Sequence, residues 1–270
     1  MKKPRFPLFF IDKVVDGKAV ISDKEQLHHL RDVLRLQVND FVDLSDIMDN
    51  FYTGEISTID KKHVEVKITM QWETPKSPVK LAVACAIPKG GRFDDVVDYL
   101  TQLGVERIIP MQTERAVVRL DRARAEEKHK RWVKIARNAA QQSHRIKIPV
   151  IEPVTGFDDA VLRSGDYDLK LIPTVSDEIR SKVFVKEDAL SDRGMIEYDL
   201  SEKRLIKDVL AKSRPKNIIV LIGPEGDFTP EEVALALHNG FTPLSLGETV
   251  LRVATAAIAV AGYIKFALDE

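Results

Sequence analysis

Cysteine is nearly absent from this chain: Cys85 is the only one among 270 residues. A single cysteine excludes a disulfide framework within the chain and fits a reducing compartment. Cys85 lies in the apolar run 81–87, which favours a buried, inert thiol over a reactive one. The six histidines show no metal-ligand spacing and have no second cysteine to join them, so we expect no metal site.

Long apolar runs and an excess of one charge are also missing. No stretch approaches the length of a membrane span, and the residues after 1–5 lack the apolar core of a signal peptide. We therefore expect a cytoplasmic protein with no membrane partner. The net charge of −1 argues against a non-specific nucleic-acid coat, while 44% hydrophobic residues suffice for the cores of two domains.

Basic residues are nevertheless concentrated in one segment. Between positions 115 and 147 there are eleven Lys and Arg residues against three Asp and Glu residues. RNA affinity depends on such local surfaces and not on the charge of the whole chain. The segment therefore suits RNA, although a solvated helix face followed by a loop is the alternative interpretation.

The hydrophobic pattern divides the chain into two regimes. Residues 1–75 predict a small β-barrel, because short alternating strands surround a helix-like turn at 24–34; the strands are expected at 18–21, 41–44, 51–59 and 63–69. A linker follows at 73–78. Strands then alternate with helices over 76–270, which predicts an α/β domain with a parallel sheet. Within it, the polar stretch 175–205 is interpreted as an insertion or mobile loop.

Two glycine loops dominate the second domain. A predicted strand at 217–222 runs into Gly223-Pro224-Glu225-Gly226, and a helix then begins with Thr229 as N-cap, Pro230 at its first position and Glu232 completing a capping box. The plan repeats with a strand at 243–246, Gly247 and a helix at 253–267.

Glycines at the carboxyl ends of parallel strands let a ligand approach the backbone closely, although a glycine turn can also serve geometry alone. The third glycine of a dinucleotide site and the phosphate-loop pattern are both missing. A nicotinamide site is therefore not expected.

Five ordered groups of motifs resemble the RsmE family of SPOUT-superfamily RNA methyltransferases. The two glycine loops, with Leu251-Arg252 and Thr255-Ala256, are similar to its cofactor-loop motifs. Further similarity covers the family's first βαβ unit at 89–93, 103–110 and 114–118, its second helix at 131–136 and 140–149, and its amino-terminal signature at 28–35.

This resemblance implies an α/β fold: a SPOUT-type parallel sheet with a C-terminal trefoil knot from about Gly223 onward, preceded by a small PUA-like β-barrel. Residues 1–75 would be the RNA-binding PUA-like domain, and residues 76–270 the methyltransferase domain with the knotted cofactor site. The helix at 253–267 fits dimer packing, although a plain core helix explains its composition equally well.

The implied activity is S-adenosyl-L-methionine-dependent methylation of N3 of a uridine in small-subunit (16S) ribosomal RNA by a homodimer. Arg252 is the candidate catalytic residue, with an exposed arginine at a helix start as the alternative. The candidate cofactor-binding residues are Pro173, Thr174, Gly223, Pro224, Glu225, Gly226, Leu246, Gly247 and Leu251. The candidate RNA-binding residues are Arg31, Arg35, Arg115, Arg119 and Arg145.

The chain departs from the family pattern at a few positions. Thr249 and Ala254 stand where the family usually has Arg and Glu, and Asp227 where it has Gly. Tyr99 and Gln102 replace its Lys and Glu. Two alternatives therefore remain: a SPOUT enzyme with another RNA target, or a catalytically weakened RNA-binding or assembly protein.

Overall fold

The computed structural model describes residues 6–74, 77–174, 183–186, 195–198, 204–212 and 214–268. The chain forms two compact units. The smaller contains Met1–Lys76 and Arg137–Ile148, and the larger contains Ser77–Ala136 and Pro149–Glu270. The smaller unit thus takes in a segment that comes well after the predicted linker.

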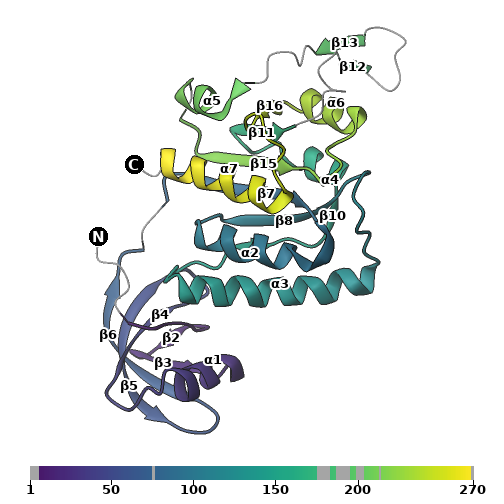
Figure 1. Cartoon of the computed structure of the whole chain (residues 1–270). Helices are drawn as coiled ribbons and strands as arrows, with labels where there is room; N and C mark the ends of the chain where they lie inside the picture. Colours follow the sequence, from purple (N-terminus) through teal and green to yellow (C-terminus); the bar gives the residue numbers. More distant parts are fainter. Residues whose placement is uncertain are drawn as a thin grey trace. The chain divides into compact units, whose positions relative to one another are not determined.

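The smaller unit is built on a six-stranded sheet with the order β1-β4-β5-β6-β3-β2 (Figure 1). Its strands are β1 (Leu8–Phe10), β2 (Val14–Val15), β3 (Lys18–Ile21), β4 (Phe41–Ser45), β5 (Phe51–Ile59) and β6 (Val64–Trp72). β1 and β4 are parallel, and the other neighbours are antiparallel. The predicted strands and helical turn are confirmed, the turn as α1 (Lys24–His28) and the π-helical η1 (His29–Val33).

Alternation of side chains gives this sheet its core. Ala19 and Ile21 of β3 are buried, whereas Lys18 and Val20, which alternate with them, are exposed, because successive strand residues point to opposite faces. Leu27 and Leu30 of the helical turn pack into the same apolar cluster. The helical turn is therefore fixed to the sheet by burial of its apolar face.

The larger unit contains a parallel sheet with the order β10-β8-β7-β15-β11-β16-β14, and β9 also pairs with β8. Among the described residues, the strand pairings in this sheet are all parallel. The strands are β7 (Lys80–Ala86), β8 (Arg107–Gln112), β9 (Val150–Ile151), β10 (Thr155–Gly156), β11 (Leu169–Pro173), β14 (Arg204–Leu205), β15 (Asn217–Ile222) and β16 (Thr242–Ser245). The prediction of an α/β domain with a parallel sheet is confirmed.

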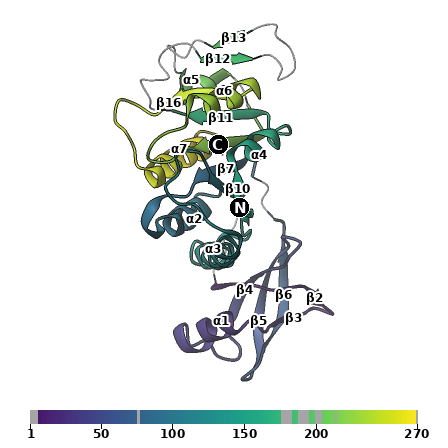
Figure 2. The same ribbon diagram turned by 90° about the vertical axis from the view of Figure 1, so that its right-hand side faces the viewer.

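Helices cover both faces of this sheet (Figures 1 and 2). They are η2 (Lys89–Gly91), α2 (Phe93–Gln102), α3 (Arg122–Gln142), α4 (Phe157–Leu162), α5 (Ile206–Lys212), α6 (Pro230–His238) and α7 (Val253–Leu268). α7 packs on β7, β15 and α2, while α4 and α6 share an apolar cluster with Ala82 and Ala84 of β7. α2 buries Phe93, Val96, Val97 and Leu100 on one side.

The stretch 175–205, predicted to be an insertion or mobile loop, lies mostly outside the described residues. Its described parts are the antiparallel strands β12 (Val183–Lys186) and β13 (Met195–Tyr198) and the short strand β14. In the part of the chain that the structure describes, no helix is both long and apolar enough to span a membrane.

Candidate functional site

The first glycine loop, defined here as residues 223–229, connects β15 to α6. The predicted capping box is confirmed: the Thr229 side chain accepts a hydrogen bond from the Glu232 amide, and the Glu232 carboxylate accepts one from the Thr229 amide. Pro230 follows at the start of the helix. The buried ring of Phe228 lies under Gly223, where an added Cβ would be 3.0 Å from it. Gly223 is therefore required for close packing within the loop.

Asp227 turns the same loop with a φ of 56°, in the left-handed region. Aspartate tolerates this conformation better than most residues with a side chain, because its carboxylate can bond the local backbone. Here the Asp227 carboxylate accepts a hydrogen bond from the Phe228 amide at 2.9 Å. The departure from the family's glycine thus keeps a backbone shape that glycine also adopts.

Neighbouring loops are bonded to the first glycine loop and to the helix that follows it. The Lys89 amide, after β7, donates to the Glu225 carboxylate at 3.4 Å. Arg115, after β8, donates to the carbonyl oxygens of Gly226 at 3.2 Å and Phe228 at 3.5 Å. The adjacent Glu114 amide donates to Glu232 at 2.8 Å. Segments from three strands therefore meet at one edge of the sheet.

The second glycine loop, defined here as residues 246–252, connects β16 to α7. Gly247 is exposed with a φ of 110°, and a Cβ added there would meet no described residue within 4 Å other than its two chain neighbours. Its amide donates to the Ser245 hydroxyl at 3.3 Å. Residues 247–250 are all exposed, whereas Leu251 is half-buried. This loop offers free backbone and open space to a ligand.

The remaining candidate residues for cofactor binding and catalysis flank these loops. Pro173 and Thr174 are buried at the end of β11, and the Thr174 amide donates to the Leu244 carbonyl at 3.2 Å. Arg252 is exposed immediately before α7, and its carbonyl accepts from the Ala256 amide. Because β11 lies between β15 and β16 in a parallel sheet, all these segments start from the same sheet edge.

The candidate RNA-binding arginines fall in both units. Arg115 and Arg119 belong to the exposed loop between β8 and α3 in the larger unit, where the Arg119 guanidinium donates to the Glu114 carbonyl at 3.1 Å. Arg31, Arg35 and Arg145 belong to the smaller unit. Arg35 is exposed with a φ of 54° just after the helical turn, and Arg145 is half-buried.

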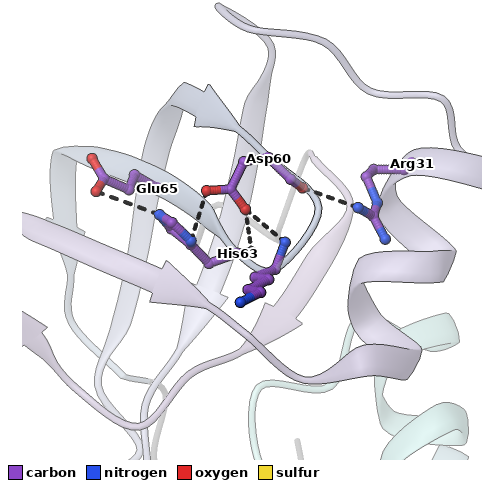
Figure 3. Close-up of polar contacts among 5 residues, drawn as sticks. Arg31, Asp60, His63 and Glu65 are labelled. Carbon is purple, nitrogen blue, oxygen red and sulfur yellow. Dashed lines mark hydrogen bonds and ion pairs between the residues drawn. The ribbon is translucent and has the colours of Figure 1, made fainter.

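Arg31 is oriented by backbone carbonyls (Figure 3). Its guanidinium donates to the Asp60 carbonyl at 2.9 Å and to the Leu27 carbonyl at 3.3 Å. The Asp60 carboxylate accepts from the amides of Lys62 and His63, and these bonds lower the pKa of Asp60. The carboxylate therefore stays ionised and fixes the turn that holds Arg31.

The pKa values of the Glu232 carboxyl and the Cys85 thiol are also shifted. Burial raises the pKa of Glu232, although its hydrogen bonds from the Thr229 and Glu114 amides act in the opposite direction. Burial also raises the pKa of the Cys85 thiol, which confirms the predicted buried and inert cysteine. Among the described residues, no group of three His, Cys, Asp or Glu side chains is arranged to hold a metal ion.

The sequence pattern indicated both glycine loops but not the hydrogen bonds that join the first glycine loop and α6 to the segments after β7 and β8. The capping-box pattern explained Glu232 completely within its own helix, so nothing indicated a partner at Glu114. The basic segment likewise gave Arg115 a role on the surface, whereas its guanidinium also donates to the first glycine loop. Both contacts join residues more than a hundred positions apart in the chain.

Comparisons with known proteins agree with this arrangement. Residues 75–265 match the RNA methyltransferase domain family, and residues 21–69 match the RNA methyltransferase PUA domain. A ribosomal RNA small subunit methyltransferase E of Bacillus subtilis is 29% identical over 87% of this chain and 84% of its own length. Its namesake in Mycobacterium bovis is 25% identical over 94% of this chain and 89% of its own length.

Solved structures give the same result. A putative methyltransferase of Legionella pneumophila, solved with the bound cofactor SAM, has a TM-score of 0.79 and 28% identity, covering 97% of this chain and 98% of its own. A probable rRNA methyltransferase of Porphyromonas gingivalis has a TM-score of 0.73 and 26% identity over 97% and 98% of the two chains. The predicted family is confirmed, and so are the α/β methyltransferase domain and the PUA-like domain before it, whereas the knot stays a prediction. The chain belongs to the RNA methyltransferase family, with an α/β methyltransferase domain preceded by a PUA-like β domain.

Proposed function

We propose that this protein transfers a methyl group from S-adenosyl-L-methionine to N3 of a uridine in small-subunit ribosomal RNA. The observation that carries the proposal is the meeting of both glycine loops and residues 173–174 at one edge of a parallel sheet. The names of the Bacillus and Mycobacterium relatives support the ribosomal substrate. The bound SAM of the Legionella structure supports the cofactor.

The residues at this edge fit the cofactor. Gly247 leaves open space where any other residue would place a side chain, and its backbone has a conformation that favours glycine. We assign adenine and ribose binding to backbone groups of both glycine loops, with Pro173, Thr174 and Leu251 as side walls. When bound, the cofactor supplies an electrophilic methyl group on a sulfonium sulfur. The neutral thioether that remains after transfer is a good leaving group.

The chain's own contribution to the reaction is positioning and charge stabilisation. The target uridine must leave its stack before an enzyme can reach N3. Arg252 then orients the uracil carbonyl oxygens and stabilises the negative charge that gathers on them when N3 releases its proton to solvent water. Because Arg252 is exposed beside the open second glycine loop, its guanidinium is accessible to RNA. Holding N3 in line with the methyl group is the main catalytic effect.

RNA binding is assigned to arginines of both units, Arg31, Arg35 and Arg145 in the smaller and Arg115 and Arg119 in the larger. We further propose that the protein acts as a homodimer in the cytoplasm and that the segment from Gly223 onward forms a trefoil knot. Exposed aromatic side chains on α7 support the dimer, since Phe266 is 73% and Tyr263 43% exposed.

Mapping of methylated nucleotides tests the function. Ribosomal RNA from cells lacking the modification is incubated with the protein and the cofactor, digested and analysed by mass spectrometry. We expect one N3-methyluridine in the small-subunit RNA, and far less of it after the same time with Arg252→Ala. Methylation of a different RNA would favour a family member with another target.

The absence of any methylation would favour the alternative of an RNA-binding or assembly protein without catalytic activity. Ala254 favours this alternative, because the family usually places a carboxylate there and this half-buried alanine cannot accept a proton. Calorimetry with S-adenosylmethionine then decides. A protein that binds RNA but neither binds the cofactor nor methylates RNA is an RNA-binding or assembly factor and not an enzyme.

A further inference from the structure

Glu232 makes one bond that its role in helix capping does not require. One carboxylate oxygen, Oε2, accepts from the Thr229 amide at 2.9 Å and completes the capping box of α6. The other, Oε1, accepts from the Glu114 amide at 2.8 Å. Glu114 follows β8, so this second bond joins α6 to the loop between β8 and α3. A capping box alone needs only the first bond.

The second bond fixes the start of a loop that carries two candidate RNA-binding residues. The β8–α3 loop, residues 113–121, begins beside Glu232 and presents Arg115 and Arg119 as exposed side chains. Arg115 donates to the Gly226 carbonyl, and Arg119 donates back to the Glu114 carbonyl. Both arginines are therefore oriented by backbone groups at or near the point that Glu232 holds.

The environment of Glu232 sets it apart from its neighbour in sequence. Glu232 is 7% exposed, whereas Glu231, one position earlier on the same helix, is exposed. A buried carboxylate costs free energy unless hydrogen bonds compensate it, and an exposed glutamate can cap a helix without that cost. Glu232 compensates this cost by accepting hydrogen bonds from two backbone amides that belong to different segments.

We propose that Glu232 is a positioning residue that holds the β8–α3 loop against the first glycine loop, so that Arg115 and Arg119 are in place for RNA. The effect of Glu232 on RNA binding rests on the proposed function, whereas its effect on the position of the β8–α3 loop does not. Removing the second acceptor should release the loop and weaken RNA binding. Cofactor affinity should change little, because the first glycine loop keeps its own turn and its buried Phe228.

Glu232→Gln is the variant that tests this role. A glutamine can still accept from the Thr229 amide through its single carbonyl oxygen, so α6 keeps its cap. Its amide nitrogen would face the Glu114 amide, and two donors cannot bond each other. Thr229→Ala is the matched control. It removes the side-chain hydroxyl that accepts a hydrogen bond from the Glu232 amide, and it leaves both Glu232 carboxylate oxygens in place. Glu231→Gln controls for the loss of charge.

Two measurements are made on the full chain: hydrogen exchange of the amides at 114–119, and methylation kinetics with RNA and cofactor varied separately. For Glu232→Gln we expect about tenfold faster exchange and about a tenfold higher KM for RNA, the factor expected from losing one hydrogen bond to a charged group. The kcat and the cofactor Kd should stay near those of the parent. Thr229→Ala should lower the Tm without either effect.

The proposal is overturned if exchange at 114–119 is unchanged, or if Thr229→Ala reproduces both effects. Faster exchange with an unchanged KM for RNA would also overturn it, because the loop would then be held for a reason other than RNA. If the parent methylates no RNA, the proposed function fails. Direct RNA binding by the parent and Glu232→Gln, measured beside the exchange, then decides the role of Glu232.

Discussion

The two glycine loops leave the same edge of one sheet but are held in different ways. The first packs Gly223 on Phe228, caps α6 and accepts hydrogen bonds from Lys89 and Arg115. In the second, Gly247 is exposed, and apart from its chain neighbours no residue that the structure describes lies within 4 Å of the place where its Cβ would be. One loop is already filled by protein, and the other is open.

Because of this difference, we expect the two glycine loops to have different roles, although their sequences follow the same plan. Bonds within the protein keep the first loop in one shape, so its glycines serve packing as well as ligand access. The second loop has an exposed surface on which a ligand can bind, and Arg252 lies at the end of this loop. We therefore expect substitutions in the second loop to affect binding and catalysis most, and substitutions in the first to affect stability.

The largest effect is expected for Arg252→Ala. If this guanidinium stabilises the developing charge on the uracil, its removal should lower the single-turnover methylation rate by about 10²–10³-fold. Cofactor affinity should stay close to that of the parent. Arg252→Lys should restore only part of the rate, because lysine lacks the two-pronged donor geometry. An alanine variant as fast as the parent would remove Arg252 from the site.

Gly247→Val should come next and should abolish most cofactor binding. Valine fills the open space, and its branched Cβ disfavours a φ of 110°. Gly240→Val is the matched control, since Gly240 is also exposed, has a φ of 83° and has nothing near its Cβ position, but lies between α6 and β16. Calorimetry with S-adenosylmethionine should show at least about tenfold weaker binding for Gly247→Val alone, or about 1.4 kcal/mol. Equal losses in both variants would mean strain and not a ligand site.

Prediction from sequence succeeded where the determining forces are local. The Thr229, Pro230 and Glu232 pattern predicted the start of α6 because capping depends on residues within one helical turn. Strand 243–246 was found one position earlier, as β16 from Thr242 to Ser245, since strand ends depend on pairing partners that a sequence does not name.

The contacts that complete the site are not local and could not be predicted in this way. The bond from the Glu114 amide to Glu232 depends on β8 and α6 meeting in space. The close approach of Phe228 to Gly223 depends on the turn at Asp227, whose left-handed backbone is not evident from an aspartate. The family resemblance supplied candidate residues, whereas the structure shows contacts of some of them, such as the bond from Arg115 to the Gly226 carbonyl.

Gly223→Ala tests the claim that the first loop is filled by protein. The added methyl group would be 3.0 Å from the Phe228 ring, so the ring or the backbone must shift. We expect the free energy of unfolding to fall by about 1–3 kcal/mol, as for overpacking in a core. Gly165→Ala is the control, because a Cβ at that exposed position meets nothing within 4 Å. Urea denaturation of both variants measures the difference, and equal stability would contradict the packing role.

The smallest effect concerns the pH dependence that Glu232 gives to the helix beside the first loop. Burial raises its pKa above the ordinary value of 4.5, aided by the carboxylates of Glu114 and Asp158 and opposed by the Thr229 and Glu114 amides. Because the folded state holds this proton more tightly than the unfolded chain, the contribution of Glu232 to stability is complete below pH 4.5. It is lost as the pH rises through the raised pKa.

Glu232→Gln should remove that component, so the difference in unfolding free energy between parent and variant should shift against the parent as the pH rises above 4.5. Urea denaturation at a series of pH values on both sides of 4.5 measures it. Glu231→Gln, at an exposed position, should follow the parent throughout. A constant difference between parent and Glu232→Gln across the series would mean that the carboxyl does not titrate differently in the folded chain. Its bonds to the two loops would then be all that it contributes.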